Sequence, residues 1–216
     1  MRVYHFLGVA WAIDDLKRGR LKISRIDDLN DPFELLGTEL ADLGQRRFFL
    51  ETKRAIAQQH GVLCFSRGWR NPLMWSHYAD KHRGLCLGFD IPNDRTKPIR
   101  YDAERLPSLL PGLLAGTPDS AALMQRLLFT KFRDWKYEKE VRVYTDLKEV
   151  DTPTGHYFAD FSDDLLLKEV ISGPRFEGTM TEIAGYARSW APGVSLIRAR
   201  LAFESFRVVP NKSVVV

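Results

Sequence analysis

The fold class is decided at residues 138–145, where the chain reads EKEVRVYT. From residue 140 onward, two valines alternate with an arginine and a tyrosine, which predicts a β-strand with one buried face. Apolar or alternating runs predict further strands at residues 3–6, 20–23, 62–65, 84–89, 98–101, 165–171 and 194–209. Stretches between them predict helices at residues 11–17, 45–59, 73–80, 120–132 and 176–190.

The predicted strands and helices are interspersed without the regular strand–helix–strand repetition of a parallel sheet, and the chain contains no GxGxxG or Walker sequence. We therefore expect one α+β domain over residues 1–216, with a mixed, mostly antiparallel split sheet flanked by helices. A variable helical insertion is expected around residues 102–130. Within it, the proline- and glycine-rich residues 106–116 are expected to be mobile.

The chain is mildly basic, with 32 Lys and Arg residues against 28 Asp and Glu residues and a formal net charge of +4. The local clusters at residues 46–47, 53–54 and 67–70 could meet phosphate, although a solvated basic face is the simpler interpretation of each. No apolar run approaches the ~20 residues of a membrane helix, and the first residues lack the apolar core of a signal peptide. We therefore expect a cytoplasmic protein without membrane contact.

Both cysteines, Cys64 and Cys86, lie in apolar stretches, so we expect buried thiols in a reducing compartment. The chain has no CxxC or HxxxH spacing, which leaves a zinc site without support. The acidic side chains of Asp134, Glu138 and Glu140 could bind Mg²⁺ as in a nuclease, but no lysine pattern typical of nucleases follows a strand. No metal is therefore expected.

Glu138 and Glu140 are the first candidates for chemistry. Carboxylates at i and i+2 leave the same face of an extended segment, and these two lie where a loop becomes a strand. Glu140 would be fixed by the sheet and could stabilise a cation, while Glu138 on the looser approach could accept a proton. The alternative is a charged strand edge paired with Lys136, Lys139 or Arg142.

The helix predicted at residues 73–80 carries the next candidates within two turns: Trp75, Ser76, His77 and Tyr78. Trp75 and Tyr78 are three residues apart and share a helical face. The alternative is a core-packing helix with one polar side. A Ser76-based catalytic triad has little support, because no GxSxG turn surrounds the serine.

His5 lies in the first predicted strand, where it could bind a ligand or simply hydrogen-bond to a neighbouring backbone group. The loop at residues 27–34 is polar, and Phe33 is available to anchor it. We expect Asn30, Asp31 and Glu34 to line the rim of a ligand pocket. The alternative is that Asp31 and Glu34 cap neighbouring backbone amides.

Several longer motifs, taken in order, resemble a widespread bacterial family of uncharacterised proteins. They are NDPFE at 30–34, CFS at 64–66, MWSHYA at 74–79, HRGLCLGFD at 82–90, WKYEKEVR at 135–142 and EVISGP at 169–174. The resemblance covers nearly the whole chain except residues 102–130. It implies no activity, because the function of that family is unknown.

The order of three residues is also similar to the ADP-ribosyltransferase fold, in the branch that uses a His–Tyr–Glu triad. The resemblance implies that His5 binds the adenine ribose of NAD, Tyr78 stacks on nicotinamide and Glu140 orients the nicotinamide ribose. Glu138 resembles the first acid of the Glu-x-Glu pair in arginine-modifying members. The sequence departs from the pattern after His5, because Phe6 and Leu7 replace the Gly and Ser or Thr of the family signature.

This second resemblance implies an enzyme that uses NAD as substrate, without a metal, and transfers ADP-ribose to a protein or nucleic-acid acceptor or hydrolyses NAD. A bacterial toxin or phage-defence effector, regulated by an antitoxin or other protein, is the setting it suggests. Besides the four catalytic candidates, the residues expected to contact NAD are Ser66, Trp75, Asn30 and Asp31. The alternative is a non-enzymatic nucleotide- or nucleic-acid-binding module with the same fold.

Overall fold

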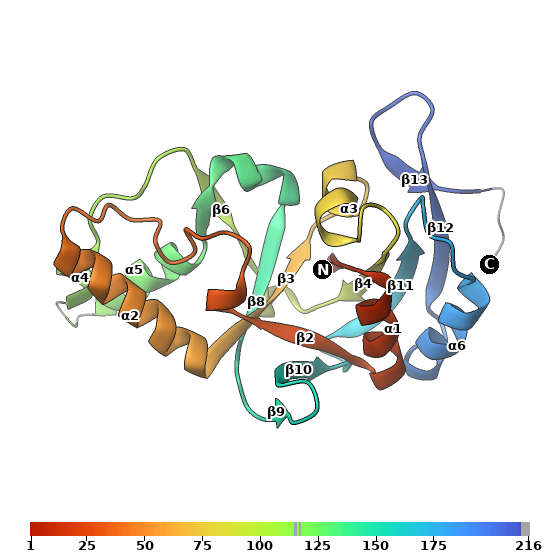
Figure 1. The fold of residues 1–216 in the computed structure, drawn as a ribbon, viewed down its shortest axis with the longest axis horizontal. Coiled ribbons are helices and arrows are strands. Elements are labelled where there is room, and N and C mark those ends of the chain that lie inside the picture. Colours follow the sequence, from red (N-terminus) through yellow and green to blue (C-terminus); the bar gives the residue numbers. More distant parts are fainter. Residues whose placement is uncertain (115, 117, 213–216) are drawn as a thin grey trace.

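The computed structural model describes residues 1–114, 116 and 118–212 (Figure 1). In this part of the chain, one sheet has eleven strands and a second sheet has two. Nine strands of the large sheet follow each other in the order β13 (Val208–Pro210), β12 (Ser195–Leu201), β11 (Leu166–Ser172), β4 (Leu85–Asp90), β1 (Arg2–Leu7), β3 (His60–Ser66), β2 (Arg20–Arg25), β10 (His156–Asp160) and β9 (Val150–Asp151). The other two are β8 (Glu140–Asp146), which pairs with β3, and β5 (Lys97–Pro98), which pairs with β8.

Nearly all pairs in the large sheet are antiparallel, and β11 with β12 is its parallel pair. The small sheet pairs β6 (Arg100–Asp102) with β7 (Thr130–Phe132), also in parallel. The prediction of an α+β domain with a mixed, mostly antiparallel sheet is therefore confirmed.

The sheet divides at β3. One edge of β3 pairs along its whole length with β8, from His60 opposite Asp146 to Ser66 opposite Glu140. The other edge pairs with β2 at residues 61–62 and with β1 only at Ser66. The strands β1 and β2 therefore separate along β3, and neither of them pairs with residues 63–65 on that edge.

Local sequence explains where the helices begin and end. Gly19 adopts a left-handed conformation with φ of 65° and ends α1 (Val9–Arg18), a backbone geometry that glycine tolerates best. The Asp42 side chain accepts a hydrogen bond from the Gln45 amide at the start of α2 (Leu43–Gln59). Asn71 caps α3 (Pro72–Tyr78), which has proline at its first position. The remaining α-helices are α4 (Leu110–Leu114), α5 (Pro118–Leu128) and α6 (Met180–Trp190), and the short 3₁₀ helices are η1 (Ile26–Asp28), η2 (Asn93–Arg95) and η3 (Arg133–Glu138).

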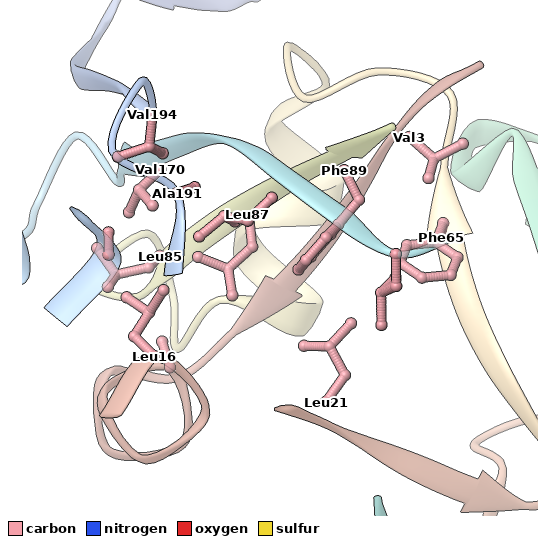
Figure 2. Packing of buried hydrophobic residues seen from close by; sticks show 14 of the residues in the cluster. Val3, Leu16, Leu21, Phe65, Leu85, Leu87, Phe89, Val170, Ala191 and Val194 are labelled. Atoms are coloured by element: carbon pink, nitrogen blue, oxygen red, sulfur yellow. The ribbon is translucent and has the colours of Figure 1, made fainter. Parts of the chain in front are cut away.

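Three apolar clusters form the core. The largest lies between the sheet and the α1–α6 pair, where Leu16, Leu85, Leu87 and Phe89 interlock (Figure 2). A second lies beneath α3 around the fully buried Trp75, and a third lies beneath α2 and α5. The molecule thus has helices at both ends of the sheet, with α3 above its centre (Figure 1). Among the helices of the described residues, none is long and apolar enough to cross a bilayer.

Two predicted helices were wrong in extent. The helix predicted at residues 120–132 ends at Leu128, and residues 130–132 form β7 instead. The helix predicted at residues 176–190 begins only at Met180, with Thr179 as its N-cap residue. The strands β9 and β10 were not predicted at all. Residues 106–116, expected to be mobile, contain α4 and a bridge between Leu106 and Thr38, while position 115 lies outside the described residues.

Candidate active site

A cavity of about 230 Å³ lies where β1 and β2 separate along β3. Its walls come from β1, the end of β2, the loop after η1, the end of β3, α3 and the start of β8. The lining residues are Tyr4, His5, Phe6, Ser24, Asp28, Leu29, Asn30, Cys64, Phe65, Ser66, Met74, Tyr78, Lys131, Glu138, Glu140 and Arg142. Most of the exposed surface of the cavity is apolar, although nine of these sixteen residues are polar or charged, and such a mixture is typical of a small-molecule site.

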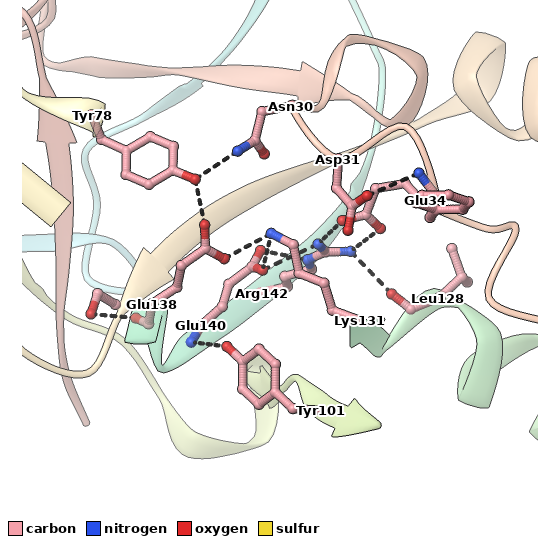
Figure 3. A network of polar contacts seen from close by, with 12 residues as sticks. Asn30, Asp31, Glu34, Tyr78, Tyr101, Leu128, Lys131, Glu138, Glu140 and Arg142 are labelled. Carbon is pink, nitrogen blue, oxygen red and sulfur yellow. Dashed lines mark hydrogen bonds and ion pairs between the residues drawn. The ribbon is translucent and has the colours of Figure 1, made fainter. Parts of the chain in front are cut away.

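The polar side of the cavity is an ion-pair network centred on two carboxylates (Figure 3). Lys131 Nζ lies 2.7 Å from Glu138 Oε2 and 3.4 Å from Glu140 Oε2. Arg142 Nε donates to Glu140 Oε1 at 2.6 Å, and its Nη1 donates to Glu34 Oε2 at 2.9 Å. The side chains of these five residues are each exposed by 6% or less, so the network is buried.

The network contains one carboxylate more than it has cations. Glu34, Glu138 and Glu140 face Lys131 and Arg142, which are the cations among the residues lining the cavity. Both cations already pair with these carboxylates, and the exposed Asp28 adds further negative charge at the rim. The cavity therefore favours a ligand with positive charge over an anion.

The two carboxylates have opposite pKa shifts. Burial raises the pKa of Glu138, because its desolvation outweighs the attraction of Lys131 and the hydrogen bond from Tyr78. Burial acts on Glu140 in the same direction, but Arg142, followed by Lys131, holds the pKa of Glu140 below its ordinary value. Neighbouring acids with divergent pKa values are the usual arrangement for one proton-transferring group and one permanently charged group.

Tyr78 connects α3 with this network. Its hydroxyl donates a short hydrogen bond to Glu138 Oε1 and accepts one from Asn30 Nδ2 at 2.7 Å. Burial, followed by the nearby Glu138 carboxylate, raises the pKa of Tyr78 far above its ordinary value. The tyrosine is therefore a permanent donor to Glu138.

His5 belongs to β1 and lines the same cavity as these acids, which come from the distant residues 138 and 140. Its Nδ1 is 2.8 Å from the carbonyl oxygen of Cys64, which lies in the stretch of β3 that pairs with β8 but with neither β1 nor β2. A carbonyl can only accept, so Nδ1 carries the proton and Nε2 is a free acceptor. Burial lowers the pKa of His5, so the ring is neutral at pH 7. The backbone hydrogen bond expected as the simpler role of His5 is confirmed, and it holds the ring in the cavity wall; ligand binding by His5 stays a prediction.

Of the four other residues expected to contact NAD, Ser66 and Asn30 line the cavity, whereas Trp75 and Asp31 do not. Ser66 lines the cavity, but its hydroxyl donates to the Glu138 carbonyl oxygen at 2.6 Å. Trp75 is fully buried beneath α3, outside the cavity lining, with its indole bonded to the Trp69 carbonyl. Asp31 is buried and accepts from the Phe33 amide, as in the capping alternative. Of the loop residues expected at the rim, Asn30 alone lies in the cavity wall.

Two features of the acid pair differ from the sequence-based description. Glu138 is not on a loose extended approach but ends the helix η3, and its side chain is only 5% exposed. Lys139 follows it in a left-handed conformation with φ of 47°, which turns the backbone between the two acids. Lys136 and Lys139 make no ion pair with either acid in the described part of the chain, whereas Arg142 does.

Lys131 and Tyr101 were missed as site residues, and Glu34 was expected in the wrong place. Lys131 was placed in a helix, but it belongs to β7 and reaches the centre of the network. Glu34, expected at the rim, is instead the buried partner of Arg142. The Tyr101 hydroxyl accepts the backbone N–H of Glu140 at 2.8 Å and fixes the start of β8.

Within the described residues, no group of three His, Cys, Asp or Glu side chains is arranged to hold a metal ion. Comparison of the chain with known protein families, with curated proteins and with solved structures found no match.

Proposed function

We propose that the cavity binds NAD and that the protein breaks the bond between nicotinamide and ribose, transferring ADP-ribose to a macromolecular acceptor or to water. The observation that carries the proposal is the meeting of His5, Tyr78 and two carboxylates of opposite pKa shift in one apolar-walled cavity. The resemblance to the His–Tyr–Glu branch of ADP-ribosyltransferases points to His5, Tyr78 and Glu140, and the resemblance of Glu138 to the first acid of the Glu-x-Glu pair in arginine-modifying members adds the fourth residue.

The charge of the site supports this substrate. NAD carries a positive pyridinium ring, and the ribose develops oxocarbenium character as nicotinamide leaves. A cavity with one carboxylate in excess stabilises both positive charges, and the apolar wall at Phe6, Leu29 and Met74 keeps the effective dielectric constant low. A phosphate group would have to lie outside this part of the cavity, because Lys131 and Arg142 are already paired.

Each polar group has a distinct role in the proposal. Glu140, ionised and held by Arg142, stabilises the developing ribosyl cation. Glu138, whose pKa is raised, accepts a proton from the incoming nucleophile. Neutral His5 accepts a hydrogen bond from a ribose hydroxyl through Nε2. Tyr78 orients Glu138 through its hydroxyl and offers its ring as a wall for nicotinamide.

The test is nicotinamide release from NAD by the purified protein, separated by liquid chromatography, with and without RNA, DNA or protein as acceptor. We expect release that Glu140→Gln lowers about 10²-fold or more, the usual effect of removing one preorganised electrostatic partner. Glu149→Gln makes the same chemical change on an exposed side chain and should leave release unchanged. If NAD binds but is never consumed under any of these conditions, the cavity is a nucleotide-binding site and the protein is not an enzyme.

A further inference from the structure

The hairpin between β12 and β13 exposes two phenylalanines. Phe203 is 90% exposed and Phe206 is 98% exposed, and Leu201 beside them is 57% exposed. Hydrogen bonds from the Ala202 amide to the Arg207 carbonyl and from the Arg207 amide to the Ser205 carbonyl close the loop. A closed loop that keeps two phenylalanines in water forgoes the stabilisation that burying them would give, which suggests a binding role.

The two rings line a groove and do not merely project into solvent. A concave space of about 780 Å³ separates the hairpin from the body of the protein, with Phe203 and Phe206 in its wall. Pro72, Pro174 and Arg175 line the same space from the body. The hairpin stands out from the molecule beside α3 (Figure 1).

The surroundings of the groove are basic. Arg175 and Arg207 line it directly, and the Arg200 guanidinium lies 4.4 Å from the centre of the Phe203 ring. Arg70 is adjacent, because its carbonyl accepts the Val208 amide of β13. In the described part of the chain, none of these four arginines forms an ion pair with a carboxylate. Among the described residues that line the groove, Glu204 is the one acid.

We propose that this groove binds single-stranded nucleic acid, with bases stacked on Phe203 and Phe206 and phosphates contacted by the unpaired arginines. Two exposed aromatic rings and several arginines without carboxylate partners in one groove suit the bases and phosphates of a single strand. A duplex keeps its bases stacked inside and offers the rings no partner. A bilayer surface cannot enter a groove, and an apolar peptide leaves the arginines without anions.

The test is fluorescence anisotropy of a labelled 12-nucleotide poly(U) or poly(dT) at 50–200 mM salt, measured without NAD. We expect binding that weakens about 30-fold or more in Phe203→Ala/Phe206→Ala, since each stacked base contributes substantially to affinity. Leu43→Ala, at another exposed apolar position, should bind as the wild type does. Arg175→Ala should lower the dependence of log affinity on log salt by about 0.7.

Several outcomes would overturn the proposal. They are absence of oligonucleotide binding at 50 mM salt, equal affinity in the double phenylalanine variant, and preference for a duplex of the same length. Two results without oligonucleotide binding would give the hairpin another partner. Phenylalanine-dependent binding to phosphatidylserine vesicles would assign it to a membrane, and a dimer that the double variant abolishes would assign it to a second copy of the chain. Because no NAD is present, the result is independent of the proposed catalytic function.

Discussion

Replacing Glu138 by glutamine should make the protein more stable and less active at the same time. The side chain is 5% exposed and is the carboxylate in excess over the two cations of its network. Glutamine keeps the size and an oxygen that can accept from Lys131 or Tyr78, but it carries no charge. The variant therefore leaves Glu34 and Glu140 balanced against Lys131 and Arg142.

The sign of the stability change follows from the pKa of Glu138, which is raised above its ordinary value of 4.5. The folded chain then holds this proton more tightly than the unfolded chain, so ionising Glu138 lowers the free energy of unfolding. This cost is absent below pH 4.5 and complete above the pKa of the folded state. Glutamine removes the cost, so its advantage over glutamate should grow as the pH rises.

The expected gain at pH 8 is about 0.5–1 kcal/mol, the usual result of relieving one unfavourable group at a functional site. It stays small because the variant also loses the Lys131 ion pair at 2.7 Å and a charged acceptor for Tyr78. For a chain of this size, the melting temperature should rise by about 1–4 °C. Transfer of ADP-ribose to an acceptor should fall about 10²-fold, while slow release of nicotinamide into water persists.

The assay is thermal unfolding followed by tryptophan fluorescence at pH 5 and pH 8, with label transfer from NAD measured on the same preparations. Glu149→Gln serves as the exposed control and should show no pH-dependent gain. A lower melting temperature for Glu138→Gln at pH 8, or a gain of equal size at both pH values, would refute the reasoning. Glu138 would then be an ordinary structural partner of Lys131.

Three further predictions concern other titratable or hydroxyl groups. Glu140→Gln should change stability in the opposite direction to Glu138→Gln. The pKa of Glu140 is lowered, so the ionised carboxylate stabilises the folded chain above pH 4.5. The variant should therefore unfold at a temperature about 4–8 °C lower at pH 7, corresponding to a loss of about 2 kcal/mol. Burial raises the pKa of Asp15 from 3.8 to about 7, so Asp15→Asn should raise the melting temperature at pH 8 by about 4 °C or more and leave it unchanged at pH 4. Tyr78→Phe should slow nicotinamide release about 10-fold with less than about 1 kcal/mol of lost stability, since the ring is kept and only the hydroxyl between Asn30 and Glu138 is removed.

The strands could be predicted from the sequence because their signals are local. Runs such as residues 84–89 and the alternation after Glu140 report burial directly, and both became strands in the large sheet. The role of Lys131 could not be predicted in this way, because lysine is almost never fully buried and its partners lie on a different segment. The Arg142–Glu34 pair joins positions 108 residues apart, which no local pattern reveals.

The grouping of His5, Tyr78 and Glu140 came from a resemblance and not from periodicity. All three line one cavity, yet their contacts differ from that simple triad, because Tyr78 binds Glu138 and not Glu140. The reason lies in the turn at Lys139, which directs the first acid toward α3 and leaves the second in the sheet with Arg142. The direction of each carboxylate therefore depends on its partners, Tyr78 for Glu138 and Arg142 for Glu140, and no local sequence pattern reveals those partners.

The short helix α3 joins the cavity to the groove at the β12–β13 hairpin. At its N-terminal end, Pro72 lines the groove and Asn71 Nδ2 donates to the Tyr137 carbonyl at 3.0 Å. At its C-terminal end, Tyr78 donates to Glu138. Both ends of α3 are therefore fixed to adjacent residues of η3, and seven residues of helix span only about 10 Å. Under the two proposals, a strand held in the groove would lie against the same helix that positions Glu138, so together they favour nucleic acid as the acceptor class.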